Sequence, residues 1–219
     1  MNRIILIRHG QADHALRGLM GGWTDSSLTD LGRAQARVTG DYLARLLGDS
    51  DFGLYSSDLR RAQQTAEIIG ECVGLAPIYD EDLREFNNGE AADLTVEAAQ
   101  QIQLPPTRPL VEYRPYPGAE NWWEMTQRVA ASLEEIGRRE HETAVVITHT
   151  LSATSVVHWW LRLGEEYWGR VSYDFDPSSL TLLTINMFGQ RTITRLNDTR
   201  HLAAAGLEAD DEALPGVKA

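Results

Sequence analysis

The sequence has a single cysteine, Cys72, among its 219 residues, so no internal disulfide can form. Cys72 follows Ile68 and Ile69 at helical spacing, which predicts a small core residue of a helix rather than a catalytic thiol. No apolar run approaches the ~20 residues that a membrane-spanning helix needs, and the short run after Arg3 lacks a signal-peptide cleavage site. We therefore expect a cytoplasmic protein with no membrane segment.

Positive charge is also scarce, because 20 Lys and Arg side chains stand against 32 Asp and Glu, a formal net charge of -12. This balance opposes binding to the phosphate backbone of nucleic acid or to an anionic membrane surface. A small anionic substrate stays open, because exposed charges are screened over about 10 Å and a few arginines can set the potential of one cleft. The sequence leaves the choice between a monomer and a homodimer open.

Apolar and amphipathic runs alternate along most of the chain. With 42% hydrophobic residues, a chain of this length is expected to form one domain around one core, here residues 1–202. Strand-like runs lie at residues 4–7, 52–55 and 144–148, and helical patterns lie at residues 29–47, 58–73, 121–140 and 151–163. This order is typical of an α/β fold, with three α/β/α layers around a mainly parallel central sheet. Alternating runs at 179–184 and 190–196 predict a hairpin that adds an antiparallel edge strand.

The helix boundaries and the irregular segments carry their own signals. Thr29 and Asp58 are candidate helix caps, and Asn121 followed by Glu124 has the spacing of a capping box. Five prolines between residues 104 and 118 exclude regular structure there and predict a lid or rim. From residue 203 to 219 the small and acidic residues lack periodicity, which predicts an acidic, disordered tail outside the domain.

Two histidines end two of the strand-like runs. Arg8-His9-Gly10 directly follows the run at 4–7, and His149 directly follows the run at 144–148. In an open α/β sheet ligands bind beyond the carboxyl ends of the strands, so the two imidazoles are expected to meet over one substrate. Arg8 supplies a planar donor fork that matches phosphoryl oxygens, and a neutral imidazole can attack phosphorus. The pattern indicates an enzyme that acts on an anion.

A second group of basic residues opens the predicted helix at 58–73. Arg60 and Arg61 lie in its first turn, where backbone N–H groups also favour anions. The two side chains are about 100° apart around the helix, so both cannot face the same cleft. One of them is expected to point into solvent.

These motifs and their order resemble the histidine phosphatase superfamily, also called the phosphoglycerate-mutase-like fold. Its members carry an Arg-His-Gly opening and a later Ser-x-Leu-x-Arg-Ala-x-x-Thr segment, which here spans residues 57–65 and selects Arg61 over Arg60. The resemblance covers the chain to Leu202 and includes segments at 22–25, 28–32, 83–85, 88–90, 118–120 and 197–202. Each segment alone is weak evidence, but their shared order and spacing are specific.

The resemblance implies a phosphatase that works through a covalent intermediate on histidine. His9 would be the nucleophile that becomes phosphohistidine, and Arg8 and Arg61 would bind the phosphoryl oxygens. His149 would complete the pocket as an imidazolium that stabilises charge on the transferring group, and Glu85 would donate a proton to the leaving alcohol. Such a histidine acid-type phosphatase would hydrolyse a small phosphorylated metabolite without a metal or a cofactor.

Several positions depart from the family pattern and keep two alternatives open. Ala15 stands where relatives have an Asn that helps hold the phosphoryl group, Thr150 stands where glycine is usual, and Gly21 stands where mutases have a hydroxyl residue. One alternative is a non-catalytic module that binds a phosphorylated ligand. The other is a cofactor-dependent phosphoglycerate mutase, which must grip a second acidic group on its substrate. The candidate residues for binding this second acidic group are Arg17, Arg84, Arg108 and Arg114.

The other histidines and the tryptophan pairs receive no catalytic role from the sequence. Three histidines are expected at the surface or in helix packing, namely His14, His141 and His158. His201 is expected in a structural or supporting position. Trp122-Trp123 and Trp159-Trp160 lie in amphipathic helices, where one ring of each pair is expected in the core.

Overall fold

The computed structural model describes residues 1–208, and residues 209–219 of the predicted tail lie outside the described residues. Within the described part, a six-stranded mixed sheet has the order β3-β2-β4-β1-β5-β6. Its strands are β1 (Arg3–Arg8), β2 (Phe52–Ser57), β3 (Ile78–Asp80), β4 (Thr143–Thr148), β5 (Leu180–Ile185) and β6 (Arg191–Asp198). The first four strands run parallel, and β5 and β6 add an antiparallel edge. The predicted α/β fold with a mainly parallel sheet is confirmed.

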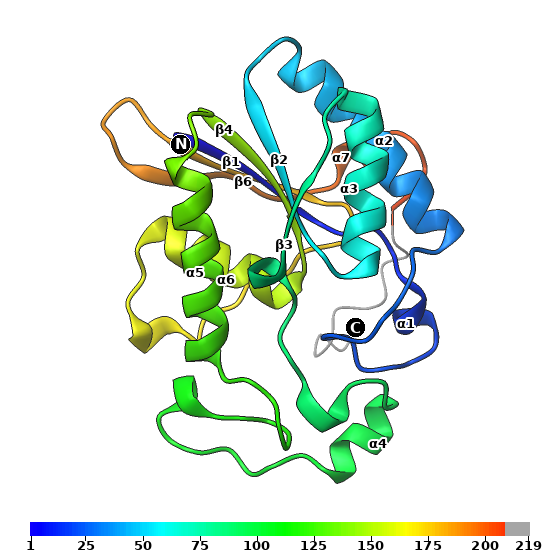
Figure 1. Ribbon diagram of the computed structural model, residues 1–219, viewed down its shortest axis with the longest axis vertical. Coiled ribbons are helices and arrows are strands. Elements are labelled where there is room, and N and C mark those ends of the chain that lie inside the picture. Colours follow the sequence, from blue (N-terminus) through cyan, green and yellow to red (C-terminus); the bar gives the residue numbers. More distant parts are fainter. Residues whose placement is uncertain (209–219) are drawn as a thin grey trace, which may run out of the picture.

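Helices cover both faces of this sheet (Figure 1). α2 (Asp30–Leu47) and α3 (Arg60–Val73) pack on one face, with the short α7 (Arg200–Ala203) against α2, and α5 (Trp122–Arg138) and α6 (Thr150–Leu161) pack on the other. The short α1 (Asp13–Leu16) and α4 (Val96–Gln101) lie toward one end of the molecule. Four 3-10 turns complete the described elements, η1 (Glu81–Leu83), η2 (Gly89–Ala91), η3 (Leu110–Glu112) and η4 (Glu165–Tyr167).

The parallel strands are apolar on both faces because helices cover both faces. In β1, Ile4 and Leu6 belong to the core cluster formed with α5 and α6, whereas Ile5 and Ile7 belong to the cluster formed with α2 and α3. All four side chains are buried. Burial on both faces holds β1 rigidly in the sheet, so the residues that follow its last position emerge at a fixed place.

Two of the predicted helix caps are confirmed. The Thr29 hydroxyl accepts a hydrogen bond from the Gly32 N–H at the start of α2, at 3.0 Å. Asn121 and Glu124 form the complete capping box at the start of α5. Both caps satisfy backbone donors that have no partner inside their helix.

The prediction that Asp58 caps α3 is wrong. The helix begins at Arg60 with Leu59 as its N-cap, and the Ser57 hydroxyl accepts the Leu59 N–H at 3.2 Å. The Asp58 carboxylate instead accepts two hydrogen bonds from Arg84, at 2.7 and 2.5 Å. A bidentate ion pair with a guanidinium is stronger than one hydrogen bond from a backbone N–H, so Asp58 points toward Arg84.

Other expectations concern packing. Cys72 is half-buried, where α3 approaches α2 closely at Gly40, and is therefore not a core residue. Trp160 is buried, as predicted for one ring of its pair, whereas Trp122 is only partly buried against the core and Trp123 is exposed. Residues 104–118 are irregular apart from η3, as their prolines predict. No helix within residues 1–208 is long and apolar enough to cross a membrane.

The turn after β1 lies directly on the first turn of α2. A Cβ at Gly32 would lie 2.0 Å from the Gln11 carbonyl oxygen, and a Cβ at Gly10 would lie 2.5 Å from the Gly32 carbonyl oxygen. The Gln11 carbonyl also accepts the Thr29 N–H at 3.0 Å. This close approach requires glycine at positions 10 and 32 and determines where the chain runs immediately after His9.

We expect Gly32→Ala to lower the free energy of unfolding by about 3 kcal/mol, the upper end of ordinary overpacking, because the added methyl meets rigid backbone. Gly137→Ala in α5 is the matched control, since a Cβ there meets nothing within 4 Å. It is expected to raise stability by roughly 0.5–1 kcal/mol. Urea denaturation measures both, and a Gly32→Ala protein as stable as the parent would contradict the proposed contact.

Candidate active site

A pocket of about 260 Å³ opens beside the carboxyl ends of β1 and β4. Four of the five residues singled out from the sequence line it, Arg8, His9, Arg61 and Glu85. The fifth, His149, is completely buried behind this wall, with its ring centroid 5.0 Å from that of His9. The other lining residues are His14, Met20, Gly21, Gly22, Phe86, Asn88, Thr150 and Leu151.

Hydrogen bonds assign the roles of the two ring nitrogens of His9. Nδ1 lies 2.7 Å from the Gly10 carbonyl oxygen, which can only accept, so Nδ1 carries the hydrogen. Nε2 accepts a hydrogen bond from Nε of Arg61 at 3.1 Å and therefore holds the lone pair. Burial, and then the positive charges of Arg61 and Arg8, keep the pKa of His9 well below its usual 6.5. The ring is neutral at neutral pH, as a nitrogen nucleophile must be.

Arg61 is a buried cation whose charge is not neutralised by a carboxylate in the described part of the chain. Its side chain is 1% exposed and donates to the carbonyls of Gly22 and Thr24 at 2.6 and 3.0 Å, and to the Ser26 hydroxyl at 3.3 Å. Burial lowers the pKa of Arg61 from 12.5 to about 10, so it stays charged at neutral pH. These neutral acceptors satisfy its N–H groups and leave a positive charge available to an anion.

The neighbouring arginines differ in what they face. Arg60 is exposed and lies 3.9 Å from Asp25, so only one arginine of this pair faces the pocket, as the helical spacing predicts. Arg8 donates from Nη1 to the Phe175 carbonyl at 2.6 Å, and its Nε is buried without a partner among residues 1–208. Burial lowers the pKa of Arg8 below its usual 12.5. The pocket thus holds two guanidinium groups with capacity for an anion.

The surroundings of His149 favour a neutral ring over the expected imidazolium. Burial, and then the charges of Arg61 and the neighbouring rings and arginines, lower its pKa well below 6.5. The Ser57 hydroxyl accepts the Leu59 N–H at 3.2 Å and lies 2.9 Å from Nε2 of His149, where the tautomer of the ring decides which of the two donates. Nδ1 of His149 has no hydrogen-bond partner within the described chain.

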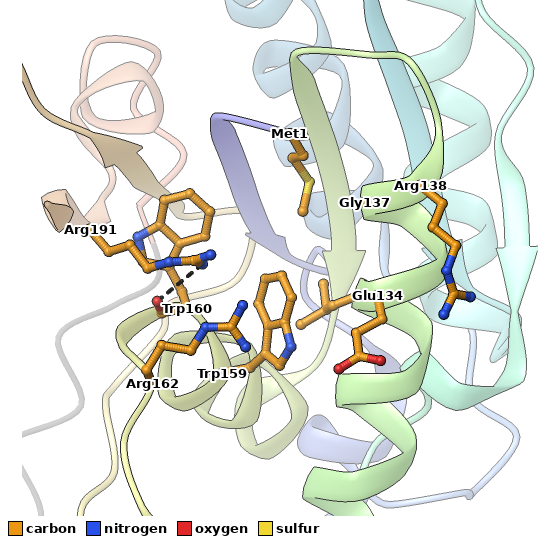
Figure 2. Close-up of a pocket in the computed structure, with 9 residues that line it drawn as sticks. Met1, Glu134, Gly137, Arg138, Trp159, Trp160, Arg162 and Arg191 are labelled. Carbon is orange, nitrogen blue, oxygen red and sulfur yellow. Dashed lines mark hydrogen bonds between the residues drawn. The ribbon is translucent and has the colours of Figure 1, made fainter. Parts of the chain in front are cut away.

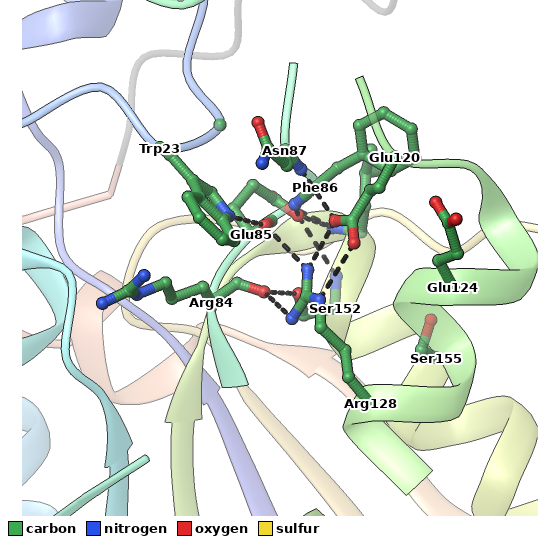
Figure 3. A network of polar contacts seen from close by, with 12 residues as sticks. Trp23, Arg84, Glu85, Phe86, Asn87, Glu120, Glu124, Arg128, Ser152 and Ser155 are labelled. Carbon is green, nitrogen blue, oxygen red and sulfur yellow. Dashed lines mark hydrogen bonds and ion pairs between the residues drawn. The ribbon is translucent and has the colours of Figure 1, made fainter. Parts of the chain in front are cut away.

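The carboxylate of Glu85 lies at the N-terminus of α6 (Figure 3). Oε1 accepts the N–H groups of Phe86, Leu151 and Ser152, at 2.8, 3.1 and 3.2 Å. Oε2 accepts only the Leu151 N–H, at 3.1 Å. One oxygen is therefore saturated and anchors the side chain, and Oε2 keeps the lone pair that could hold a proton.

Arg128 of α5 fixes the segment that carries Glu85, and the sequence does not identify it. Its guanidinium donates to the carbonyls of Asp82, Arg84 and Glu85 at 2.8, 2.7 and 2.9 Å (Figure 3). It also forms a largely buried ion pair with Glu120 at 2.6 Å. One cation therefore binds three carbonyls within four residues of the segment that carries Glu85.

Trp23 and Arg84 hold the same segment from the opposite side. The indole N–H of Trp23 donates to the Glu85 carbonyl at 2.7 Å, and the Arg84 guanidinium stacks on the Trp23 ring at 4.8 Å. Arg84 is thus occupied by Asp58 and Trp23. None of the four arginines expected to grip a second acidic group lines the pocket.

Two expectations about pocket composition need correction. His14 lines the pocket rather than the surface, with its ring centroid 6.3 Å from that of His9. The proline-rich segment at 104–118 contributes no lining residue, so it is not the immediate rim. His201 is a structural residue, as expected, and its Nε2 lies 2.9 Å from the Thr39 hydroxyl of α2.

A larger cavity of about 420 Å³ lies between the far ends of α5 and α6 (Figure 2). Arg162 and Arg191 stack on the ring of Trp159 at 5.0 and 5.5 Å, and Glu134 lies on the opposite wall. This cavity has no imidazole, thiol or hydroxyl nucleophile among its lining residues. The smaller pocket, where a neutral imidazole meets uncompensated cations, is therefore the candidate active site.

No group of three or more His, Cys, Asp or Glu side chains within residues 1–208 is placed to hold a metal ion. The fold and the pocket define an α/β protein that can bind an anion and present an imidazole lone pair to it. The chain matches the family model of the histidine phosphatase superfamily (branch 1) over residues 4–199 and belongs to this superfamily. The predicted resemblance is confirmed.

Individual relatives include phosphatases and a mutase. Phosphoserine phosphatase 1 of Hydrogenobacter thermophilus is 29% identical over 215 residues, which cover 95% of this chain and 98% of that protein. A 2,3-bisphosphoglycerate-dependent phosphoglycerate mutase of Allorhizobium ampelinum is 37% identical over 105 residues, 44% of this chain and 47% of that protein. The structure of mycobacterial glucosyl-3-phosphoglycerate phosphatase with VO3 has a TM-score of 0.76 at 26% identity, covering 90% of this chain and 99% of that one.

The buried neutral histidines are expected to make stability fall in acid. In the unfolded chain an imidazole binds a proton below about pH 6.5, whereas the pKa values of His9 and His149 are far lower in the fold. The unfolded state then binds more protons, so stability is lost as pH falls below about 6.5, by up to about 1.4 kcal/mol per pH unit for each histidine. Urea titrations at several pH values measure this slope. His149→Asn should reduce it, and an unchanged slope would mean that His149 titrates normally in the fold.

Arg128→Met should destabilise the fold by about 3 kcal/mol, because Glu120 and three carbonyls lose a buried cation. Arg138→Met in the same helix is the matched control. Its ion pair with Glu135 is exposed, so a change within about 0.5 kcal/mol is expected. Equal effects of the two substitutions in urea denaturation would contradict the role given to Arg128.

Proposed function

We propose that the protein is a phosphomonoesterase that hydrolyses a small phosphorylated metabolite through a phosphohistidine on His9, with Glu85 as the proton donor. One observation carries the proposal. The lone pair at Nε2 of His9 and the open oxygen of Glu85 belong to one pocket, whose cations Arg8 and Arg61 lack a carboxylate partner within the described residues. A phosphoryl group placed between them would contact a nucleophile, an acid and two anion-binding groups at once.

In the first step, Nε2 of His9 attacks phosphorus, and the N–P bond forms as the P–O bond to the alcohol breaks. Glu85, protonated at Oε2 when the dianionic phosphoryl group is bound, gives this proton to the departing alkoxide. Arg8 and Arg61 stabilise the charge on the phosphoryl oxygens, and they act strongly because the site excludes much of the water. The Nδ1 hydrogen bond to Gly10 orients the ring and stabilises the positive charge that develops on His9.

In the second step, the Glu85 carboxylate takes a proton from water as the water oxygen attacks phosphorus. The P–N bond breaks, inorganic phosphate leaves, and His9 returns to the neutral form. No step requires an electron acceptor or a metal-bound hydroxide, since the protein supplies base, acid and positive charge.

The substrate class follows from the size and charge of the pocket. A volume of about 260 Å³ lies below the ~300–1,000 Å³ of sites for drug-sized ligands, so a short metabolite fits better than a large one. Asn88 and the backbone around Gly21 and Gly22 offer polar contacts beyond the phosphoryl site. The relatives named for phosphoserine and glucosyl-3-phosphoglycerate support a phosphomonoester of this size.

Hydrolysis is favoured over mutase chemistry because a mutase must hold a second acidic group while its intermediate reorients. Arg84 is paired with Asp58, Arg114 is paired with Glu124, and Arg17 and Arg108 are exposed outside the pocket. Hydrolysis by water needs no binding site for a second acidic group. A non-catalytic role is disfavoured because the nucleophile and Glu85 are both present and oriented.

Labelling with an aryl phosphate that carries radioactive phosphorus, with a chelator present, tests the proposal. The parent protein should retain an acid-labile label after rapid quenching, and His9→Ala should retain none. Glu85→Gln should slow hydrolysis of an alkyl phosphate by about 10²–10⁴, with a smaller effect on an aryl phosphate, whose leaving group needs less protonation.

Label on the His9→Ala protein would contradict the assignment of the nucleophile. Turnover that stops when the chelator is added would contradict the metal-independent scheme. Tight binding of the phosphoester without hydrolysis would favour the non-catalytic module, and isomerisation of a phosphoglycerate faster than its hydrolysis would favour the mutase.

A further inference from the structure

We propose that His14 is a further phosphate-binding residue of this pocket, which donates a hydrogen bond from Nε2 to a bound phosphoryl group as a neutral imidazole. The proposal rests on the proposed function, which places this phosphoryl group at His9. It adds a specific donor that neither the family motifs nor the chemistry of His9 and Glu85 requires.

The position of His14 is the first observation. It lies in α1 and lines the pocket together with His9, Arg8 and Arg61. The ring centroids of His14 and His9 are 6.3 Å apart and the rings are tilted by 60°, so they do not stack. At this separation a phosphoryl group bound at Nε2 of His9 would lie within reach of the His14 ring.

Hydrogen bonding of Ser26 is the second observation. The buried Ser26 hydroxyl accepts from Nη1 of Arg61 at 3.3 Å and lies 2.9 Å from Nδ1 of His14. Arg61 takes one lone pair of this hydroxyl and leaves its hydrogen free to be donated to Nδ1. In this arrangement, which the proposal adopts, His14 carries its own hydrogen on Nε2.

The surroundings of Nε2 are the third observation. The Nε2 edge lies over Gly21, where an added Cβ would lie 3.3 Å from Nε2 and 3.5 Å from Cδ2. Nε2 has no hydrogen-bond partner in the described protein, although Nδ1 has one. Glycine at position 21 leaves this edge of the ring open to the pocket that both residues line.

The charge state of His14 agrees with a neutral donor. Burial, and then the charges of Arg61 and Arg8, lower its pKa from 6.5 to about 4, and Asp13 opposes this shift. His14 therefore adds a donor without adding a third positive charge next to the two guanidinium groups. The following residue, Ala15, is exposed and has no polar side-chain atom, so it cannot supply this donor.

Binding of inorganic phosphate to His14 variants tests the proposal without any need for turnover. His14→Phe keeps a ring but has no donor, and it should weaken phosphate binding by about tenfold or more, the effect of one lost hydrogen bond to a charged group. His14→Gln keeps an N–H donor of similar reach and should recover most of the affinity. Isothermal titration of the folded proteins measures all three dissociation constants.

Two further variants separate the loss of the hydrogen-bond donor from a change in the fold. Gly21→Ala should weaken phosphate binding in the same direction, because its methyl group crowds the Nε2 edge. His141→Phe is the control, since His141 is bonded to Asp51 far from the pocket and should bind phosphate like the parent. Urea denaturation of each variant shows whether the fold is retained.

Phosphate affinity that is unchanged in a folded His14→Phe protein would overturn the proposal. An affinity that is lost equally in His14→Phe and His14→Gln would also overturn it, because shape rather than donation would then matter. A failure of the proposed function would appear in the labelling experiment instead. The parent protein would then carry no phosphoryl label on His9, and the His14 variants would still differ in phosphate affinity as predicted.

Discussion

The site depends on one buried charge that has no carboxylate partner within residues 1–208, the guanidinium of Arg61. Removing a cation from water is costly unless its donors are satisfied. Here the carbonyls of Gly22 and Thr24 and the hydroxyl of Ser26 satisfy them without cancelling the charge. In a chain with a formal net charge of -12, this arrangement concentrates positive potential in one small volume. An anion bound in the pocket would supply the negative charge that no carboxylate in the described part of the chain provides.

Two independent supports fix the positions of the proposed reacting groups around this charge. On one side, the close backbone contact between Gln11 and Gly32 fixes the chain after β1 and hence the ring of His9. On the other side, Arg128 and the N-terminus of α6 hold the loop and the carboxylate of Glu85. The proposed nucleophile follows a strand and the proposed acid lies in a loop, so the loop needs the larger set of hydrogen bonds. The buried ion pair with Glu120 meets that need.

Much of this arrangement could be predicted from the sequence, because the relevant signals are local. Apolar runs that end in His9 and His149 indicate strand ends, and helical spacing together with the family motif distinguishes Arg61 from Arg60. Arg128 could not be found in this way, since its acceptors are carbonyls 43 to 46 residues away and any residue type provides a carbonyl. His14 was missed because α1 has only four residues, too few to show a periodic face.

The protonation of the two buried histidines follows from burial first and from the neighbouring charges second. Burial, and then the positive charge of Arg61, lower the pKa of both His9 and His149 well below 6.5, which keeps the lone pair of His9 available. A phosphoryl dianion bound as proposed would offset the guanidinium charges and favour a proton on a nearby ring. In the proposed scheme Nε2 of His9 faces phosphorus and His14 donates as a neutral ring, so this proton would go to His149, whose Nε2 lies 2.9 Å from the Ser57 hydroxyl. The imidazolium expected at position 149 would then be a consequence of phosphoryl binding.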